Sequence, residues 1–202
     1  MENIVLFGAP GVGKGTHASI LAEKYDLLHL STGDMLRNEI TENTPLGQRV
    51  KQTMDRGDLV GDDVVISLVD KALSSTDKGI ILDGFPRTVQ QAQALDFLFK
   101  RHQRRLSCVI SIDAPREELV RRIAERSMIS NRVDDANQET INHRLEEYEH
   151  KTKPVVDYYK VSGRLICIDG SGEINQTSMR LCKVVDNVVS RQKTKPPCNT
   201  NI

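Results

Sequence analysis

The sequence predicts an α/β domain in which a five-stranded parallel sheet carries helices on both faces. Two observations predict this class. Five short apolar runs recur along the chain, and stretches with apolar residues at helical spacing separate them. The length of 202 residues suits one domain, and a hydrophobic fraction of 38% is enough to form its core.

The five predicted strands are short runs, most of them rich in Val, Ile and Leu. Continuous apolar runs of this kind are typical of parallel strands that are covered on both faces. The predicted strands are Asn3–Phe7, Leu27–Leu30, Gly79–Asp83, Cys108–Asp113 and Arg164–Asp169.

Apolar residues spaced three and four apart predict a helix after each strand. One such stripe, from Val64 to Leu73, follows Asp62 and Asp63, whose negative charges suit a helix N-terminus. Another runs from Ile141 to Val155 and is expected to bend near Pro154, because proline interrupts helical hydrogen bonding. The other stripes begin at Ala18, Val89, Leu119 and Leu181.

Two intervals interrupt the alternation of strand and helix. Residues 31–60 are too many for one crossover and hold two short helical patterns, and residues 127–137 form a polar excursion between two helices. We therefore expect a single core over residues 1–190 with two small mobile inserts. The polar residues 191–202, with Pro196-Pro197, are expected to form a flexible tail.

Composition excludes several classes of protein. Lys plus Arg is 28 and Asp plus Glu is 28, so the net charge is zero, which disfavours a nucleic-acid or membrane-surface partner. No signal peptide or membrane span is visible, and no two cysteines have the C-x-x-C spacing of a zinc site. Nothing suggests a disulfide framework, so a reducing compartment such as the cytoplasm is expected. Cys108 and Cys167 lie in apolar runs and are expected to be buried.

A phosphate-binding loop follows the first predicted strand. Residues 8–16 read GAPGVGKGT, which fits G-x-x-x-x-G-K with a strand before it and a helix after it. Glycines allow backbone N–H groups to surround an anion, and the helix N-terminus and Lys14 add positive charge. No G-x-G-x-x-G dinucleotide fingerprint is completed, and the guanine-reading N-K-x-D motif does not occur.

The loop departs from the usual pattern at the residue after the lysine. That residue is Gly15, and the hydroxyl that normally ligates Mg²⁺ comes one position later, at Thr16. We therefore expect the metal to rest on phosphate oxygens and on waters oriented by nearby acids. Asp83, at the end of the third strand, and Asp34, after the second, are the candidates.

Five motifs occur in order along the chain. They are GAPGVGKGT (8–16), LSTGDMLR (30–37), GDLVGDDVV (57–65), LDGFPRTVQQ (82–91) and RVDD (132–135). Together they resemble the adenylate kinases, which transfer the γ-phosphoryl group of ATP to AMP with Mg²⁺. The resemblance covers roughly residues 3–189 and implies an AMP-binding lobe over 31–60 and a short lid over 127–137. The sequence departs from the family at His17, which stands where glutamine is usual, and at Ala136, which resembles a single insertion.

The resemblance implies a role for particular residues. The residues implied to bind ATP are Gly11, Val12, Gly13, Lys14, Gly15, Thr16, Arg122, Arg126 and Gly172. Those implied to bind AMP are Thr32, Arg37, Asp58, Leu59, Val60, Gly84, Phe85, Pro86, Arg87, Gln91, Arg132 and Arg144. The residues implied to act on the transferred group are Lys14, Arg87, Arg126, Arg132 and Arg144, because guanidinium groups suit phosphate oxygens.

Within this family the sequence favours AMP as the acceptor, and a monomer is the default expectation for the assembly. Relatives that accept UMP or CMP typically carry alanine in place of Thr32 and asparagine in place of Thr88. The lid has no zinc-binding cysteines, so no zinc is expected. The ligands that the resemblance implies are ATP, AMP, ADP and Mg²⁺. A UMP/CMP kinase of the same fold and an inactive nucleotide-binding regulatory protein remain the alternatives.

Overall fold

The computed structural model describes residues 2–130, 132–135 and 137–193. Its strands form one fully parallel sheet in the order β2-β3-β1-β4-β5. The predicted five-stranded parallel sheet is therefore confirmed, and no predicted strand boundary is wrong by more than one residue. The strands are β1 (Asn3–Phe7), β2 (Leu28–Ser31), β3 (Ile80–Asp83), β4 (Cys108–Asp113) and β5 (Leu165–Asp169).

Alternate residues of the central strand face two different hydrophobic cores. In β1, Ile4 and Leu6 pack on one side of the sheet, and Val5 and Phe7 pack on the other. All four are nearly excluded from solvent, which explains why β1 reads as a continuous apolar run.

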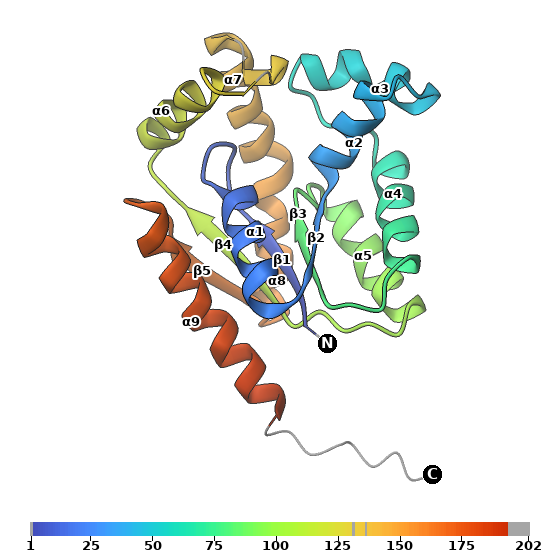
Figure 1. Ribbon diagram of the computed structural model, residues 1–202, viewed down its shortest axis with the longest axis vertical. Helices are drawn as coiled ribbons and strands as arrows, with labels where there is room; N and C mark the ends of the chain where they lie inside the picture. The colour runs from blue at the N-terminus through green and yellow to red at the C-terminus, as the bar shows by residue number, and fades with distance from the viewer. Residues whose placement is uncertain (1, 131, 136, 194–202) are drawn as a thin grey trace.

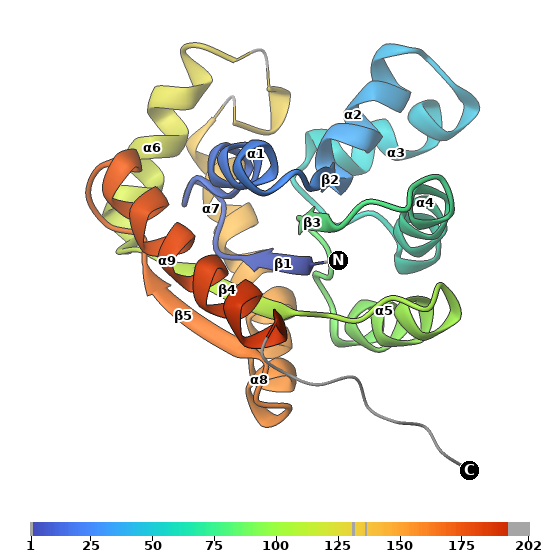
Figure 2. The same cartoon turned by 60° about the horizontal axis from the view of Figure 1, so that its bottom comes forward.

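Helices cover both faces of this sheet. The core that contains Ile4 and Leu6 includes residues of α1 (Lys14–Tyr25) and α9 (Ile174–Lys193). The core on the opposite face includes residues of α4 (Asp62–Ser74), α5 (Val89–Arg101) and α8 (Lys153–Val161). Figure 2 shows α1 and α8 on opposite sides of β1, as a three-layered α/β fold requires.

The first interval that interrupts the alternation holds two helices, α2 (Thr32–Thr41) and α3 (Pro45–Asp55). Ser31 caps α2 by accepting a hydrogen bond from the Asp34 amide, and Thr44 caps α3 with Pro45 at its first turn. Local residue chemistry therefore explains the break between the two helices.

The second interval connects α6 (Arg116–Ser127) to α7 (Gln138–Glu147) and includes a 3₁₀ turn, η1 (Val133–Asp135). Figure 1 shows this connection and the α2–α3 pair on either side of the molecule, beyond the carboxyl ends of the strands. Ala136 lies outside the described residues.

The helix that was expected to bend near Pro154 is interrupted earlier. A π-helix, η2 (Tyr148–Thr152), separates α7 from α8, and Pro154 lies in the first turn of α8. Proline lacks an N–H and its ring would collide with the carbonyl of His150 in a regular α-helix. The wider π turn before Pro154 removes this conflict.

Two expectations from the sequence are wrong in detail. Cys108 is buried, but Cys167 is exposed, because β5 is an edge strand and only one of its sides is fully packed. Helix α9 continues to Lys193, three residues into the expected tail, and residues 194–202 lie outside the described part. None of the helices in the described ranges is long and apolar enough to cross a bilayer.

Candidate active site

A large cleft lies at the carboxyl ends of β1 and β3, where the chain reverses the direction in which strands are added to the sheet. This switch point is where open α/β sheets bind ligands. The cleft walls come from the phosphate loop, α2, the loop after β3, α6, α7 and the start of α9. Segments far apart in the sequence therefore meet at one site.

The phosphate loop presents an uncapped helix N-terminus to this cleft. Gly13 is the N-cap of α1 with φ near +95°, a conformation that glycine adopts without strain, and no side chain caps the helix. Gly11 packs so tightly that an added Cβ would lie 2.7 Å from the Leu119 carbonyl oxygen. The first amides of α1 are therefore available to an anion.

Lys14 lies at the centre of this loop. Its Nζ donates hydrogen bonds to the carbonyl oxygens of Gly8 at 2.7 Å and Ala9 at 3.0 Å. The residue is only partly covered from solvent, but its ammonium is surrounded by protein, and this desolvation lowers the pKa of Lys14 to about 7 against the opposing attraction of Asp83. A ligand that brings negative charge to the loop would favour the protonated lysine.

Asp83 ends β3 beside Lys14 and is 8% exposed. Burial alone would raise the pKa of its carboxyl, but His29, Lys14 and Arg87 together hold that pKa below its ordinary value. His29 Nε2 lies 3.5 Å from Asp83 Oδ2, a contact too long to satisfy the imidazole nitrogen fully. Asp83 is therefore an ionised carboxylate that faces the start of α1.

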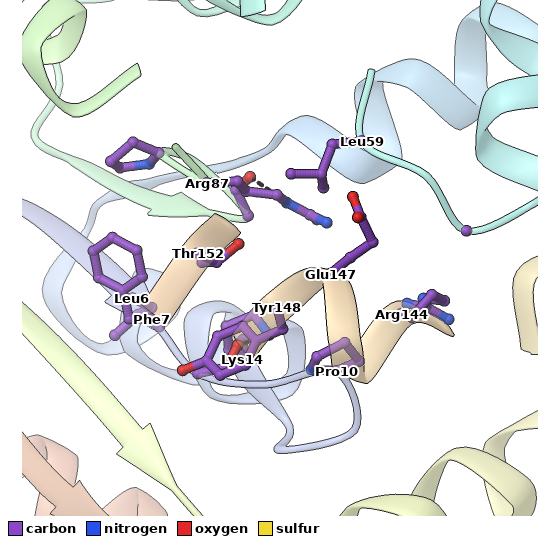
Figure 3. A pocket seen from close by; sticks show the side chains of 14 residues that line it. Leu6, Phe7, Pro10, Lys14, Leu59, Arg87, Arg144, Glu147, Tyr148 and Thr152 are labelled. Carbon is purple, nitrogen blue, oxygen red and sulfur yellow. Dashed lines mark hydrogen bonds between the residues drawn. The ribbon is translucent and has the colours of Figure 1, made fainter. Parts of the chain in front are cut away.

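Arg87 follows the loop after β3 and has no carboxylate partner among the described residues. Its Nε donates to the Gly84 carbonyl oxygen at 2.8 Å. Desolvation, and next the nearby positive charge of Arg144, lower the pKa of Arg87. Figure 3 shows Arg87, Lys14 and Arg144 around one pocket, which Glu147, Tyr148 and Thr152 complete.

The other arginines of the cleft are paired with carboxylates. Asp135, whose side chain has no exposed surface, accepts from Arg126 Nε at 2.7 Å, from Arg126 Nη2 at 2.9 Å and from Arg144. Burial opposes the ionisation of Asp135, but the two guanidinium groups lower its pKa overall. Arg144 also lies 2.9 Å from Asp134. The aspartates of this segment therefore hold two arginines in place.

Asp34 connects the α2–α3 lobe to the α6–α7 connection. Its Oδ1 accepts from Arg37 at 2.5 Å and from Arg132 at 3.4 Å. A second contact to the α2–α3 lobe comes from helix α7, where His143 Nε2 lies 2.7 Å from Asp58 Oδ1. The two lobes thus touch each other across the cleft.

A smaller pocket adjoins the cleft beside α2. Thr32 is 2% exposed and donates from Oγ1 to the Gly84 carbonyl oxygen at 2.9 Å. Gln91, also 2% exposed, accepts from the Arg87 amide at 2.7 Å. The pocket is lined by Thr32, Gly33, Leu36, Met54, Asp58, Leu59, Val60, Val65, Gly84, Arg87 and Gln91.

Comparison with known proteins agrees with this geometry. A profile of the family described as adenylate kinase matches residues 6–164. The adenylate kinase of Flavobacterium psychrophilum is 44% identical over 190 residues, which cover 93% of this chain and 100% of that protein. The adenylate kinase of Thermus thermophilus is 46% identical over 180 residues, with 89% and 95% covered.

The chain belongs to the adenylate kinase family. It is therefore a phosphotransferase of the nucleoside monophosphate kinase class, and the resemblance that the sequence motifs predict is confirmed. Adenylate kinases use ATP, with Mg²⁺, and AMP and ADP as substrates.

The family's implied ATP residues lie together along one wall of the cleft. Arg122 is a connecting residue here: its guanidinium donates to the carbonyl oxygens of Val12 at 3.3 Å, Gly170 at 3.0 Å and Gly172 at 2.8 Å. It thereby ties the phosphate loop to the loop after β5. Residues 11–16, Arg122, Arg126 and Gly172 all line the cleft.

The implied AMP residues also converge, with one exception. Phe85 is 1% exposed, belongs to the hydrophobic core and lines none of the three pockets in the described part of the chain. Pro86 lines the pocket of Figure 3. Arg37, Arg132 and Arg144 line the cleft rather than the small pocket.

Two residues of the adenylate kinase site were not singled out from the sequence. Asp135 belongs to the RVDD motif and Asp62 begins a predicted helix, but neither pattern indicates a contact with the site. In the structure Asp135 binds Arg126 and Arg144, and Asp62 binds Gln91. The acidic residues themselves can be seen in the sequence. Their partners, Arg126 and Arg144 for Asp135 and Thr88 and Gln91 for Asp62, lie in other segments that only the fold brings close.

Proposed function

We propose that this chain transfers the γ-phosphoryl group of ATP directly to AMP within the cleft, giving two ADP reversibly. The observation that carries the proposal is the pair of cations Lys14 and Arg87, which have no carboxylate partner in the described part of the chain and flank an uncapped helix N-terminus. Such a site is complementary to phosphate groups.

ATP would occupy the side of the cleft formed by the phosphate loop and α6. Amides of Gly11–Thr16 and the ammonium of Lys14 would hold its phosphates, and Arg122 and Gly172 would lie beside its base. Lys14 would release the Gly8 and Ala9 carbonyl oxygens and turn to the phosphates. Arg126 would approach the transferred group.

AMP would occupy the small pocket beside α2. Arg37 and Arg87 would bind its phosphate, while Thr32, Gln91 and the backbone of residues 58–60 would contact its base, and Gly84–Pro86 would border it. Arg132 and Arg144 would reach the phosphates from the lid side.

The proposed reaction is an in-line attack by an AMP phosphate oxygen on the γ-phosphorus. The acceptor is already an oxyanion, so no general base is needed, and the protein's contribution is to position both nucleotides and neutralise charge. Lys14, Arg87, Arg126, Arg132 and Arg144 are the residues that we assign to this neutralisation.

The residues present fit a magnesium ion that is held chiefly by phosphate oxygens and water. No cluster of three or more His, Cys, Asp or Glu side chains able to hold a metal occurs in the described ranges. Asp83 is ionised and lies 3.4 Å from an ideal Cβ built at Gly15, so it would orient metal-bound waters beside Thr16. Asp34 would first have to release Arg37 and Arg132. The ion, when bound, would offset phosphate charge.

We propose that the AMP-binding lobe (31–60) and the lid (127–137) move on the core. Water competes with AMP for the phosphoryl group, so the site must close before transfer; lid closure in adenylate kinases is itself an established example of such gating. The contact Arg132–Asp34 joins the lid to the AMP-binding lobe, and His143–Asp58 joins helix α7 to that lobe, so both contacts would favour the closed form.

Acceptor specificity tests the proposed function most directly. A coupled assay with ATP and AMP, UMP, CMP or GMP should give the highest kcat/KM with AMP, because Thr32 and Gln91 line the pocket. A preference for UMP or CMP would replace the proposal with a pyrimidine nucleotide kinase.

Lys14→Met should lower kcat by roughly 10²–10³-fold, the effect of removing one preorganised donor from a transition state. Circular dichroism should show an unchanged fold, since the hydrogen bonds of the Lys14 ammonium within the described part of the chain go to Gly8 and Ala9 of its own loop. A folded variant with near-normal turnover would contradict the assignment of Lys14.

We further propose that the protein acts as a cytoplasmic monomer without nucleic-acid or membrane partners. The zero net charge supports this, as do the free cysteines Cys108, Cys167 and Cys182. Light scattering at micromolar concentration should give a mass near 22.7 kDa.

A further inference from the structure

Asp62, the first residue of α4, binds two side chains of the segment that follows β3. Its Oδ2 accepts a hydrogen bond from Thr88 Oγ1 at 2.9 Å, and its Oδ1 accepts from Gln91 Nε2 at 2.7 Å. Thr88 Oγ1 in turn accepts from the Gln91 amide at 3.1 Å as the N-cap of α5. One carboxylate therefore joins the start of α4 to the start of α5.

These contacts fix the direction in which the Gln91 side chain presents its amide. Nε2 donates to the Asp62 carboxylate, while Oε1 accepts from the Arg87 backbone N–H at 2.7 Å. A carboxylate only accepts and an N–H only donates, so a reversed amide would meet an unfavourable partner at both ends. Because Gln91 is 2% exposed, water cannot compensate for that mismatch.

A fixed amide distinguishes two kinds of purine edge. The remaining hydrogen of Nε2 and the remaining lone pair of Oε1 form a donor beside an acceptor. Adenine offers the complementary pair, an acceptor at N1 and a donor at the 6-amino group. Hypoxanthine offers the reverse, an N1–H donor and an O6 acceptor, which an amide free to turn would accept equally well.

We propose that Asp62 is a positioning residue that sets the selectivity of this enzyme for AMP over IMP by holding the Gln91 amide in one orientation. The inference rests on the proposed function, since it takes Gln91 as a contact to the AMP base. It adds a residue that does not touch the nucleotide and acts only through Gln91 and Thr88.

The test compares kcat/KM for AMP and IMP at saturating Mg-ATP in the wild type, Asp62→Ala, Asp62→Asn and Asp63→Ala. Asp63→Ala is the matched control, because Asp63 is exposed, carries the same charge at the same helix N-terminus and has no hydrogen bond to Gln91. The KM for ATP is measured in parallel.

Asp62→Ala should lower the AMP-to-IMP ratio by roughly tenfold, as one buried polar contact loses its orientation, with the KM for ATP unchanged. Asp62→Asn should retain most of the ratio, because its carbonyl oxygen can still accept from Gln91, and Asp63→Ala should retain all of it. If Asp62→Ala does not fold, Thr88→Val, which removes the hydroxyl on Asp62, supplies the comparison and should lower the ratio in the same direction.

An unchanged ratio in folded Asp62→Ala, or equal losses with AMP and IMP, would overturn the proposal, since a merely structural role would produce that result. The proposed function is tested separately by the wild type and by Gln91→Ala. If the wild type does not prefer AMP to IMP, or if Gln91→Ala retains full kcat/KM for AMP, the assignment of Gln91 fails, and the role of Asp62, which acts through Gln91, fails with it.

Discussion

Lys14 and Arg87 differ from the other cations of the cleft because, in the described residues, neither forms an ion pair or hydrogen bond with a carboxylate, although Asp83 lies close enough to attract both. Burying these positive charges is therefore unfavourable in free energy until a bound phosphate offsets it. For Lys14 this cost is expressed in the pKa, which desolvation lowers to about 7. Nucleotide binding should consequently change the protonation of this residue.

We predict that ATP binding takes up protons at pH 8 and not at pH 6. With a pKa near 7, free Lys14 is mostly neutral at pH 8, and bound phosphates restore its charge, so uptake should approach about 0.9 proton per site. At pH 6 the free lysine is already protonated. Calorimetric titration in buffers of different ionisation enthalpy measures the uptake, and Lys14→Met should remove it. Equal uptake at both pH values would contradict the shifted pKa.

Asp135 is the residue on which two lid-side arginines depend. We predict that Asp135→Asn lowers the free energy of unfolding by about 3 kcal/mol, because it leaves Arg126 and Arg144 without their buried charge partner. It should also lower kcat. Urea denaturation measures the first effect.

Asp134→Asn is the matched control for Asp135→Asn. Asp134 is the preceding residue; its carboxylate pairs with Arg144 and with no second arginine in the described ranges, and 15% of its side chain is exposed. Asp134→Asn should lower the free energy of unfolding by less than Asp135→Asn does. An equal decrease would show that the burial of Asp135 is not decisive.

The N-termini of the helices differ in how their first amides are satisfied. The N-termini of α2, α3, α5 and α7 are capped by Ser31, Thr44, Thr88 and Asn137. Helices α1, α4, α6 and α8 have no side-chain cap. Among these four, α1 follows the glycine-rich loop at the cleft, so its free amides are the ones placed to bind an anion.

We predict that Asn137→Ala lowers the free energy of unfolding by about 1 kcal/mol. Asn137 Oδ1 accepts from the Thr140 amide at 2.7 Å, and this cap begins the helix that carries Arg144. Thermal and urea denaturation should detect the loss. Asn137→Ser can still cap and should stay within a few tenths of a kcal/mol of the wild type. Equal stability of all three proteins would mean that the cap contributes nothing.

At the scale of the whole molecule, zero net charge conceals a modest excess of positive charge at the cleft. Eight Lys and Arg residues and six Asp and Glu residues line it. Arg37 is paired with Asp34 of its own lobe, Arg132 of the lid with the same Asp34, and Arg144 of α7 with Asp134 of the lid, so ligands must exchange with these carboxylates. Closure and charge neutralisation are therefore coupled.

We predict that ATP hydrolysis without AMP is well below the rate of phosphoryl transfer with AMP. The AMP-binding lobe would not complete the closed site without its ligand, and the phosphoryl group would meet no positioned acceptor. Release of phosphate from ATP, measured with and without AMP, provides the comparison. Comparable rates would contradict closure as the control of the reaction.

The sequence by itself determined the sheet, the phosphate loop and the family. These features are local, because apolar strands, helical stripes and GAPGVGKGT each depend on residues that are close together in the sequence. They can therefore be predicted without knowledge of tertiary contacts. The boundaries of β1 and β4 follow directly from such patterns.

Only the tertiary structure decided which carboxylate holds which cation or amide. Asp62 lies 29 residues from Gln91, and Arg132 lies 98 residues from Asp34. It also decided that Cys167 is exposed and that the interruption expected near Pro154 takes the form of a π-helix over Tyr148–Thr152. Hydrogen bonds and ion pairs act over a few ångströms, so their partners are fixed only when folding brings distant segments together.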